Sequence, residues 1–352
     1  MEHNIDLKTK EKMKKNLVYV GIFSVIMLFA GFTSAYIVLM GDSFWLKYPM
    51  PTAFLISTAL VITSSVTFYL ALLSTKKNKL NGTKAFMSIT VLLGALFVYF
   101  QFKGYGELID RGFYASNNNL LVVDGRYGDY FKIAKNEEMI QLNGNDYTIN
   151  GKVLGEDAMK DLKSFVEPFL NFKQGKQINY SDWPSSYSLY FQGFPVKYSN
   201  EFLICSNGDT LEFVNLNRMK QLAQNIIDER GDFFAKGTFG KDFQLFYKGE
   251  ELGYEVDGDD RYLTFQGKPL SASLRNKALQ AADSASSFLY IITFVHLLHI
   301  AIALLYLLRL AIGSFSGKFT SENYIGLKTG SIFWHFLGLL WVYLLLFLIY
   351  IH

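Results

Sequence analysis

Residues 333–352 read FWHFLGLLWVYLLLFLIYIH, and this stretch contains no charged side chain and only two histidines. A hydrocarbon core of about 30 Å is crossed by a helix of about 20 apolar residues. The stretch therefore predicts a transmembrane helix. Four more runs are long enough and free of charge, and the five together cover residues 17–40, 48–74, 85–102, 284–308 and 329–352. The sequence thus predicts an all-α polytopic membrane bundle of five transmembrane helices.

The distribution of lysine and arginine predicts the orientation of these helices. Five lysines precede the first run, four fall in residues 75–84, and three basic residues fall in residues 309–328. Basic residues in short connections remain in the cytoplasm, and these segments share one side of the membrane if the five helices alternate. We predict a multi-pass membrane protein with the N terminus in the cytoplasm and with His352 and residues 104–283 on the outer side of the membrane.

Residues 104–283 have a different composition and predict a folded domain outside the membrane. They contain 26 acidic and 20 basic side chains. Turn signals such as Asn143-Gly144 separate short β-type stretches, and two segments are helix-compatible, which indicates an α+β fold. The predicted organisation is a cytoplasmic tail (1–16), transmembrane helices one to three (17–103), a periplasmic α+β insertion (104–283) and transmembrane helices four and five (284–352).

A short internal echo occurs within this predicted domain. Residues 148–154 read TINGKVL and residues 264–270 read TFQGKPL, and each is followed by a helix-compatible stretch. Two interpretations stay open at the level of the sequence. The segments are either two copies of one hairpin-to-helix unit or a turn motif that recurs by chance.

Apart from His352 at the end of the last run, three of the five histidines fall inside the predicted spans, at positions 296, 299 and 335. Ionisable side chains are costly in hydrocarbon, so they indicate a function or a specific partner. His296 and His299 are three residues apart and share one helix face. At about 1.5 Å per residue, His299 lies roughly 22 Å and His335 roughly 25 Å from the outer membrane face. These two imidazoles could therefore meet at one depth.

Three interpretations of the histidines compete. They could ligate a b-type haem, but Phe333, Trp334 and Phe336 crowd the site and leave little room for a macrocycle. They could relay protons or carry a metal ion, but the five runs contain no Asp or Glu beside them. The favoured interpretation is that neutral imidazoles hydrogen-bond across helices, at about 1 kcal/mol each. The sequence predicts no metal site.

Other polar residues narrow the chemistry further. Cys205 is the only cysteine, so no internal disulfide is expected, and no CxxCH motif attaches a c-type haem. Gln101, near the end of the third run, is expected to be a hydrogen-bonding group at the membrane interface.

Four of the runs contain motifs that resemble those of haem-copper oxidase subunit III. TFVHLLHIAIALLYLL (293–308) resembles that family's T-G-x-H-G-x-H helix, and FWHFLGLLWVYLLLFLIY (333–350) resembles its Y-W-H-F-V-D-V-V-W helix. SVIMLFAGFTSAY (24–36) and ITSSVTFYLAL (62–72) are similar to two further spans. The likeness covers the five spans in order, and residues 104–283 have no counterpart in it.

The resemblance implies a non-catalytic subunit of a cytochrome c oxidase in the aerobic respiratory chain of a bacterial inner membrane, with the outer side facing the periplasm. Such a subunit packs on subunit I, holds phospholipid, and supports stability and proton uptake. The chain would then be part of an oxidoreductase without a redox centre or bound cofactor of its own, and haem and copper would belong to partner subunits I and II. It departs from the family at Val25 and Gly338, where carboxylates are usual, at Lys328, and at Phe294 and Leu297, where glycines are usual.

The candidate site residues follow from this likeness and from the membrane boundaries. The resemblance implies structural, lipid-facing or subunit-facing roles for six residues, which are Thr293, His296, His299, Trp334, His335 and Trp341. By their position near the cytoplasmic interface, three basic residues are candidates for binding lipid headgroups, and these are Lys84, Arg309 and Lys328.

Alternative functions and partners remain open from the sequence. The chain could be a subunit III-like protein of a quinol oxidase, an accessory protein of a nitric oxide reductase, or a stand-alone b-type haem protein. For residues 104–283 we hypothesise docking to a neighbouring respiratory complex, or to a basic carrier such as cytochrome c. No nucleic-acid partner is expected.

Overall fold

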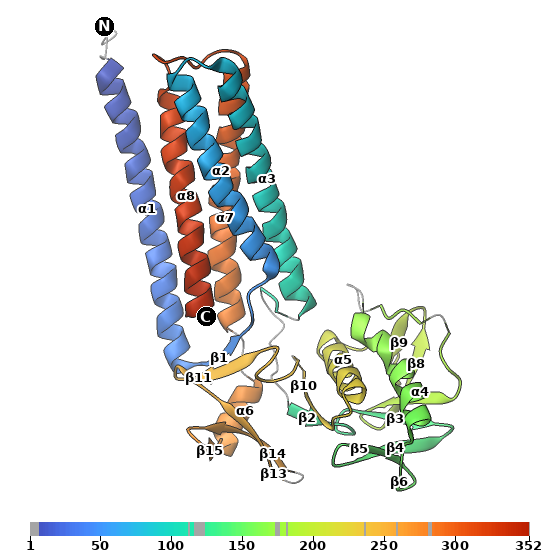
Figure 1. Cartoon of the computed structure of the whole chain (residues 1–352). Helices are drawn as coiled ribbons and strands as arrows, with labels where there is room; N and C mark the ends of the chain where they lie inside the picture. The colour runs from blue at the N-terminus through green and yellow to red at the C-terminus, as the bar shows by residue number, and fades with distance from the viewer. Residues whose placement is uncertain are drawn as a thin grey trace. The chain divides into compact units, whose positions relative to one another are not determined.

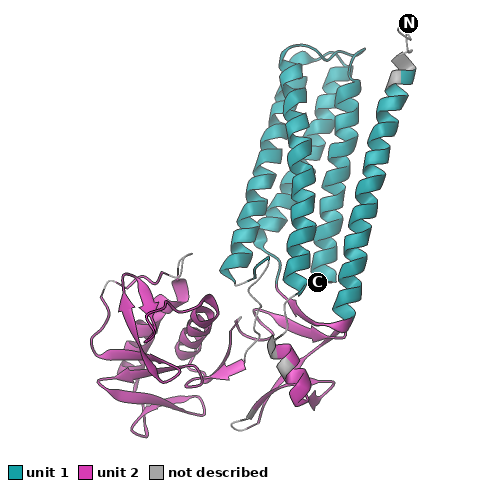
Figure 2. Cartoon of the chain, turned by 180° about the vertical axis from the view of Figure 1, so that it is seen from behind, with its two compact units in different colours: residues 1–41, 49–117, 284–352 teal, residues 42–48, 118–283 magenta. Residues whose placement is uncertain are grey.

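The structure is a computed structural model that describes residues 7–111, 113–115, 124–172, 177–180, 182–235, 237–257, 260–280 and 284–351. The chain divides into two compact units, which are coloured separately in Figure 2. The first contains residues 1–41, 49–117 and 284–352, and the second contains residues 42–48 and 118–283. Each unit is described by itself.

The first unit is a bundle of five long helices that lie side by side (Figure 1). Their bounds are α1 Leu7–Asp42, α2 Thr52–Lys76, α3 Leu80–Asp110, α7 Ser284–Phe315 and α8 Ile325–Tyr350. All five are long and apolar enough to cross a membrane. The prediction of five membrane-spanning helices is confirmed at that level, and α3 continues past the expected boundary at residue 103.

Hydroxyl groups inside the bundle are satisfied both within and between helices. Thr67 and Thr90 join α2 to α3 with their side-chain oxygens 2.8 Å apart, and Thr75 and Thr83 do the same at 3.0 Å. Each of these hydroxyls also lies within hydrogen-bonding distance of a carbonyl three or four residues earlier in its own helix, so in each pair one hydroxyl donates across the helices and the other donates to its own carbonyl. Such bonds remove the cost of an unpaired polar group in an apolar core.

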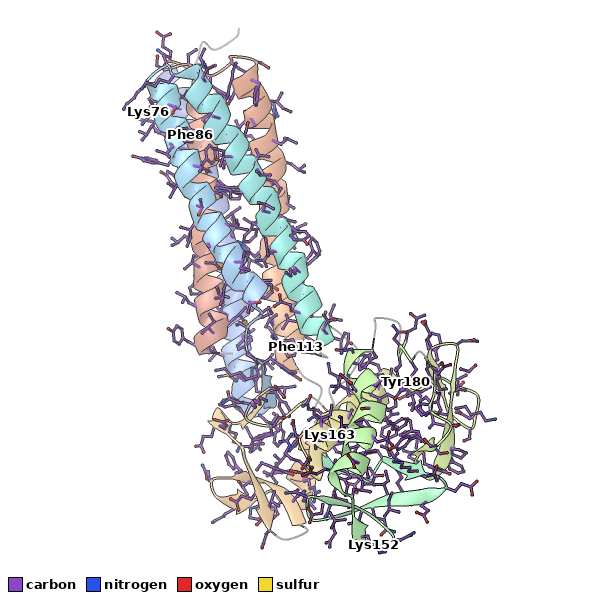
Figure 3. All side chains as sticks on the ribbon, turned by 45° about the vertical axis from the view of Figure 1, so that its right-hand side comes forward. Lys76, Phe86, Phe113, Lys152, Lys163 and Tyr180 are labelled. Carbon is purple, nitrogen blue, oxygen red and sulfur yellow. The ribbon has the colours of Figure 1, made fainter. Side chains whose placement is uncertain are left out.

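The two ends of the bundle are closed by different contacts. Lys76 lies at one end and Phe113 at the other (Figure 3). At the first end, Asn78 and Ser321 exchange two hydrogen bonds and so tie the α2–α3 connection to the α7–α8 connection. At the other end, Tyr290 of α7 donates to the carbonyl of Phe113 at 2.7 Å.

Helix α1 packs on the bundle through one narrow stripe. Its buried side chains are Val25, Phe29, Thr33 and Tyr36, spaced four, four and three residues apart. Between Glu11 and Val25 the helix has no buried side chain. The first half of α1 therefore stands apart from the bundle core, whereas the second half packs on it.

The second unit is built around one seven-stranded antiparallel sheet. Its order is β6 (Lys152–Val153), β5 (Asp146–Ile149), β4 (Glu138–Asn143), β3 (Phe131–Lys135), β7 (Tyr187–Phe191), β8 (Phe194–Ser199) and β9 (Phe202–Ile204). The helices that share its core are α4 (Glu156–Val166), the short 3-10 helix η1 (Glu167–Asn171) and α5 (Phe213–Ile227). A sheet-rich region with helices, separate from the bundle, agrees with the predicted α+β class.

Helix α4 shows why these segments fold onto the sheet. Its buried residues are Met159, Leu162, Phe165 and Val166, so apolar side chains recur at intervals of three or four. This spacing places them on one face of a helix. They join a core that includes Ile133 and other strand residues, while the opposite face stays in solvent.

Smaller sheets complete the second unit. In the first, β11 (Gln244–Tyr247) pairs with β1 (Phe44–Lys47) and β12 (Glu250–Glu251). In the second, β10 (Asp232–Phe234) pairs with β2 (Asp124–Arg126), and in the third, β14 (Asp260–Phe265) pairs with β13 (Gly253–Asp257) and β15 (Lys268–Pro269). Helix α6 (Ala272–Gln280) follows β15.

Strand β1 lies in the short connection between α1 and α2, within residues 17–103, where the sequence predicted only transmembrane helices and their connections. Phe44 pairs with Tyr247, and their rings stack with centroids 4.5 Å apart. Trp45, Leu46 and Tyr48 are only 1%, 2% and 3% exposed. Residues 42–48 are therefore part of the core of the second unit.

The internal echo corresponds to one repeated local structure. In residues 147–154 and 263–270, a two-residue turn with positive φ at both positions joins two strands. The leucine at the end of each segment donates its N–H to the carbonyl of the first residue, at 2.9 and 3.0 Å. Both segments form a hairpin that leads into a helix, and this local likeness is compatible with duplication and with a recurring turn motif alike. Leu211 bonds back to Leu203 in the same way before α5.

Candidate functional site

The two tryptophans of the α8 motif bind α2. Trp334 Nε1 donates to Ser64 Oγ and Trp341 Nε1 donates to Thr58 Oγ1, both at 2.8 Å. Each hydroxyl in turn donates to a carbonyl of α2. Both indoles are almost completely buried, at 1% and 0% exposure. These tryptophans therefore supply the polar contacts between α8 and α2.

His296 lies at the point where four helices meet. Its ring stacks on Trp341 of α8, with centroids 5.4 Å apart, and makes edge contacts with Phe97 of α3 and Phe29 of α1. The side chain is completely buried, and neither ring nitrogen has a hydrogen-bond partner among the described residues. It is an apolar-packed imidazole on the inner side of α7.

His299 and His335 bond within their own helices. His299 Nδ1 lies 2.7 Å from the carbonyl oxygen of Val295, and His335 Nε2 lies 2.9 Å from Ser331 Oγ. Both partners are four residues earlier. Helical side chains point toward the preceding turn, which brings this partner within reach. Among the described residues, the expectation that the imidazoles hydrogen-bond across helices is therefore wrong.

The cross-helix hydrogen bonds come from other side chains. Tyr105 of α3 donates to Thr293 Oγ1 of α7 at 3.1 Å, and Gln101 Nε2 of α3 donates to Ser57 Oγ of α2 at 2.8 Å. Gln101 is completely buried between helices, and its expected role as a hydrogen-bonding group is confirmed. In the sequence, the signal for this contact is Gln101 itself, a single amide side chain four residues before Tyr105.

The aromatic rings around His296 decide whether a haem could bind there. Phe29, Phe97 and Trp341 surround the His296 ring at centroid distances of 5.4 to 6.3 Å. A haem held by a ring nitrogen of this imidazole would need the volume that these rings occupy. The surroundings of His296 therefore do not fit a haem.

The three basic candidates have different surroundings. Lys328 Nζ lies 2.9 Å from Glu11 Oε1, and the same oxygen lies 2.6 Å from Lys15 Nζ. This links the first turn of α8 to the first half of α1. Lys84 Nζ lies over the Phe315 ring at 6.0 Å from its centroid, and Arg309 is exposed. Headgroup binding by these residues stays a prediction.

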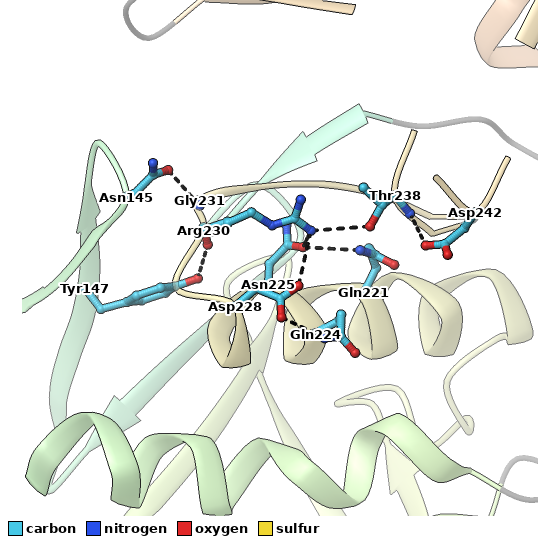
Figure 4. A network of polar contacts seen from close by, with 10 residues as sticks. All are labelled: Asn145, Tyr147, Gln221, Gln224, Asn225, Asp228, Arg230, Gly231, Thr238 and Asp242. Carbon is cyan, nitrogen blue, oxygen red and sulfur yellow. Dashed lines mark hydrogen bonds and ion pairs between the residues drawn. The ribbon is translucent and has the colours of Figure 1, made fainter. Parts of the chain in front are cut away.

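The second unit contains a polar network around Asn225, shown in Figure 4. Asn225 Oδ1 accepts from Gln221 Nε2 at 3.2 Å and from Arg230 Nη2 at 2.9 Å. Tyr147 of β5 donates to the Arg230 carbonyl at 2.6 Å. Burial raises the pKa of the Tyr147 phenol, so it remains a donor. The network fixes the end of α5 against the sheet.

A charged triad joins three elements elsewhere in this unit. Asp161 Oδ2 of α4 accepts from Lys135 Nζ of β3 at 2.6 Å and from Tyr187 of β7 at 2.9 Å. The hydrogen bond from Lys135 holds the pKa of the Asp161 carboxyl below its ordinary value. These contacts hold α4 against the sheet.

Comparisons with known proteins add no identification. No protein-family model matches the chain. None of the curated proteins matches it either.

Proposed function

We propose that the chain is a non-catalytic subunit of a haem-copper terminal oxidase, similar to subunit III, that packs on the catalytic subunit in the membrane. The proposal is supported by the contacts of the residues in the family-like motifs, which join helices of the bundle. Trp334 and Trp341 bind α2, Thr293 accepts a hydrogen bond from α3, and His296 fills the junction of four helices. The residues that resemble the family are therefore used to hold helices together.

Enclosure of His296 favours this scaffold role over a stand-alone b-type haem protein. A ligating imidazole needs a free ring nitrogen directed at open space, whereas aromatic rings from three other helices pack around this one. Within the five charge-free runs there is also no carboxylate to pass a proton to an imidazole. Chemistry by this chain alone is thus disfavoured by its own packing.

The rest of the proposal rests on sequence and charge. The lysine distribution supports a cytoplasmic N terminus, and the family resemblance supports a bacterial inner membrane. Phospholipid would bind along the bundle, with headgroups near Lys84, Arg309 and Lys328. Haem and copper would belong to partner subunits. Residues 104–283, with an excess of acidic side chains, would dock a neighbouring respiratory subunit or a basic electron carrier, and the electron donor is either cytochrome c or quinol.

Co-purification tests the proposal directly. The tagged full chain is extracted from its own membranes in a mild detergent, and the complex is examined by mass spectrometry and by visible spectroscopy. We expect a haem-containing, multi-spanning partner in fixed stoichiometry. A chain that purifies without such a partner, under conditions in which other respiratory complexes stay intact, would contradict the proposal.

A further inference from the structure

Three sides of helix α8 are occupied within the chain, and one is open. Trp334 faces α2, Gly330 faces α7 and Tyr343 faces α1. At about 100° per residue, His335 and Leu339 point between the directions of Trp334 and Tyr343. The open side of α8 therefore lies between α1 and α2, which flank it in Figure 1. We call the residues His335, Leu339 and Leu346 the open face.

The open face is apolar except for one ring. Leu339 is 70% exposed and Leu346 is 47% exposed. Beside them, Ile62 and Tyr69 of α2 are 51% and 52% exposed. His335 is half-buried, and the ring of Phe68 in α2 lies against it with centroids 6.4 Å apart.

The His335 ring has a hydrogen-bonding capacity that its own helix does not use. Its Nε2 is bonded to Ser331 Oγ. An imidazole has a second nitrogen, which donates or accepts according to the tautomer. His335 is not among the residues with a buried unpartnered atom. The second nitrogen is thus presented to the surroundings of the helix rather than to the core.

Hydrocarbon is an unfavourable environment for that nitrogen. Acyl chains offer no hydrogen bond, and polar side chains inside a membrane face protein or water. His335 is the eleventh residue of α8, roughly 15 Å along the helix from its first residue. A lipid headgroup, which stays at the interface, does not reach that depth.

We propose that the open face of α8 is where a transmembrane helix of the partner subunit docks, with a hydroxyl or amide side chain hydrogen-bonded to His335. The inference rests on the proposed function, because it names the surface by which the subunit packs on its partner. Ser, Thr, Asn or Gln suits the site because these side chains serve either imidazole tautomer. Leu339 and Leu346 supply the apolar contact on the same side.

The test places a photo-reactive amino acid at Leu339 in the full chain, in its native membranes. Leu305 of α7, which is also 70% exposed, is the matched control. We expect Leu339, and not Leu305, to cross-link to a transmembrane helix of the partner, and mass spectrometry to place a hydroxyl or amide side chain within one turn of the adduct. His335→Leu should weaken partner association about fivefold, the equivalent of about 1 kcal/mol, and His335→Gln should restore it.

Each other outcome overturns the inference. An adduct with a second copy of the chain, or with lipid only, would assign the open face to a different occupant. A partner that co-purifies but cross-links only at Leu305 would refute this face while leaving the proposed function standing. Failure of co-purification would refute both. Because Ser331 supports the ring, Ser331→Ala serves as a second variant if His335→Leu does not fold, and its failure to weaken association would count against the inference.

Discussion

Removing the indole of Trp45 should destabilise the second unit, although this residue lies in the connection between two membrane helices. Trp45 is 1% exposed, and its strand pairs with β11. Truncation of a buried Trp to Ala costs about 3–5 kcal/mol. For a domain of this size, 1 kcal/mol shifts the melting temperature by about 2–4 °C, so we expect a fall of roughly 10 °C in Trp45→Ala.

Trypsin digestion of the purified full chain at stepped temperatures measures this shift. Residues 104–283 contain 20 lysines and arginines, so unfolding of the second unit exposes many cleavage sites. Phe194→Ala is the control, since Phe194 is an aromatic strand residue that is 62% exposed. Its melting temperature should stay close to that of the unaltered chain. If Trp45→Ala melted together with the control, residues 42–48 would not belong to the core of the second unit.

Three further predictions concern single contacts. Trp334→Phe removes the indole N–H together with the ring that carries it, so Ser64 loses its donor and a small cavity is left at a buried site. This should cost at least about 1–3 kcal/mol in unfolding of the detergent-solubilised bundle, and an unchanged stability would contradict the contact. Because the folded pKa of Asp161 is depressed by Lys135, its contribution is present above the ordinary aspartate pKa and is lost as pH falls through the folded value. Asp161→Asn should therefore flatten the acid limb of the stability–pH profile, and an unaltered limb would contradict this. A double-mutant cycle of Glu11→Gln and Lys328→Gln should give a favourable coupling that weakens with salt, whereas additive effects would mean that α1 and α8 are not linked at this point.

The membrane part of the fold could be predicted because its signal is local. A charge-free run of about 20 residues fixes a spanning helix without reference to the rest of the chain. The hairpin-to-helix echo was also visible, because a two-residue turn with positive φ favours Asn-Gly and related pairs. In both cases the determining residues are neighbours in sequence.

What could not be predicted depends on distant pairing. Strand β1 is only four residues long and pairs with residues 244–247, about two hundred positions away. Nothing in FWLK by itself distinguishes such a strand from a loop. The prediction of cross-helix hydrogen bonds from the histidines was wrong for a related reason. The sequence indicates that His299 and His335 need partners, but the choice between the preceding turn and a neighbouring helix depends on the rotamer and the packing around each ring.

The central claim is that this chain holds helices and a partner together while the chromophore belongs to that partner. The most direct measurement is a visible spectrum of the full chain after it has been separated from its co-purified partner and shown to remain folded. We expect no Soret band in the separated chain and the whole haem spectrum in the partner fraction. A stoichiometric Soret band that stays with the separated chain, and that is lost in His299→Ala or His335→Ala, would contradict it.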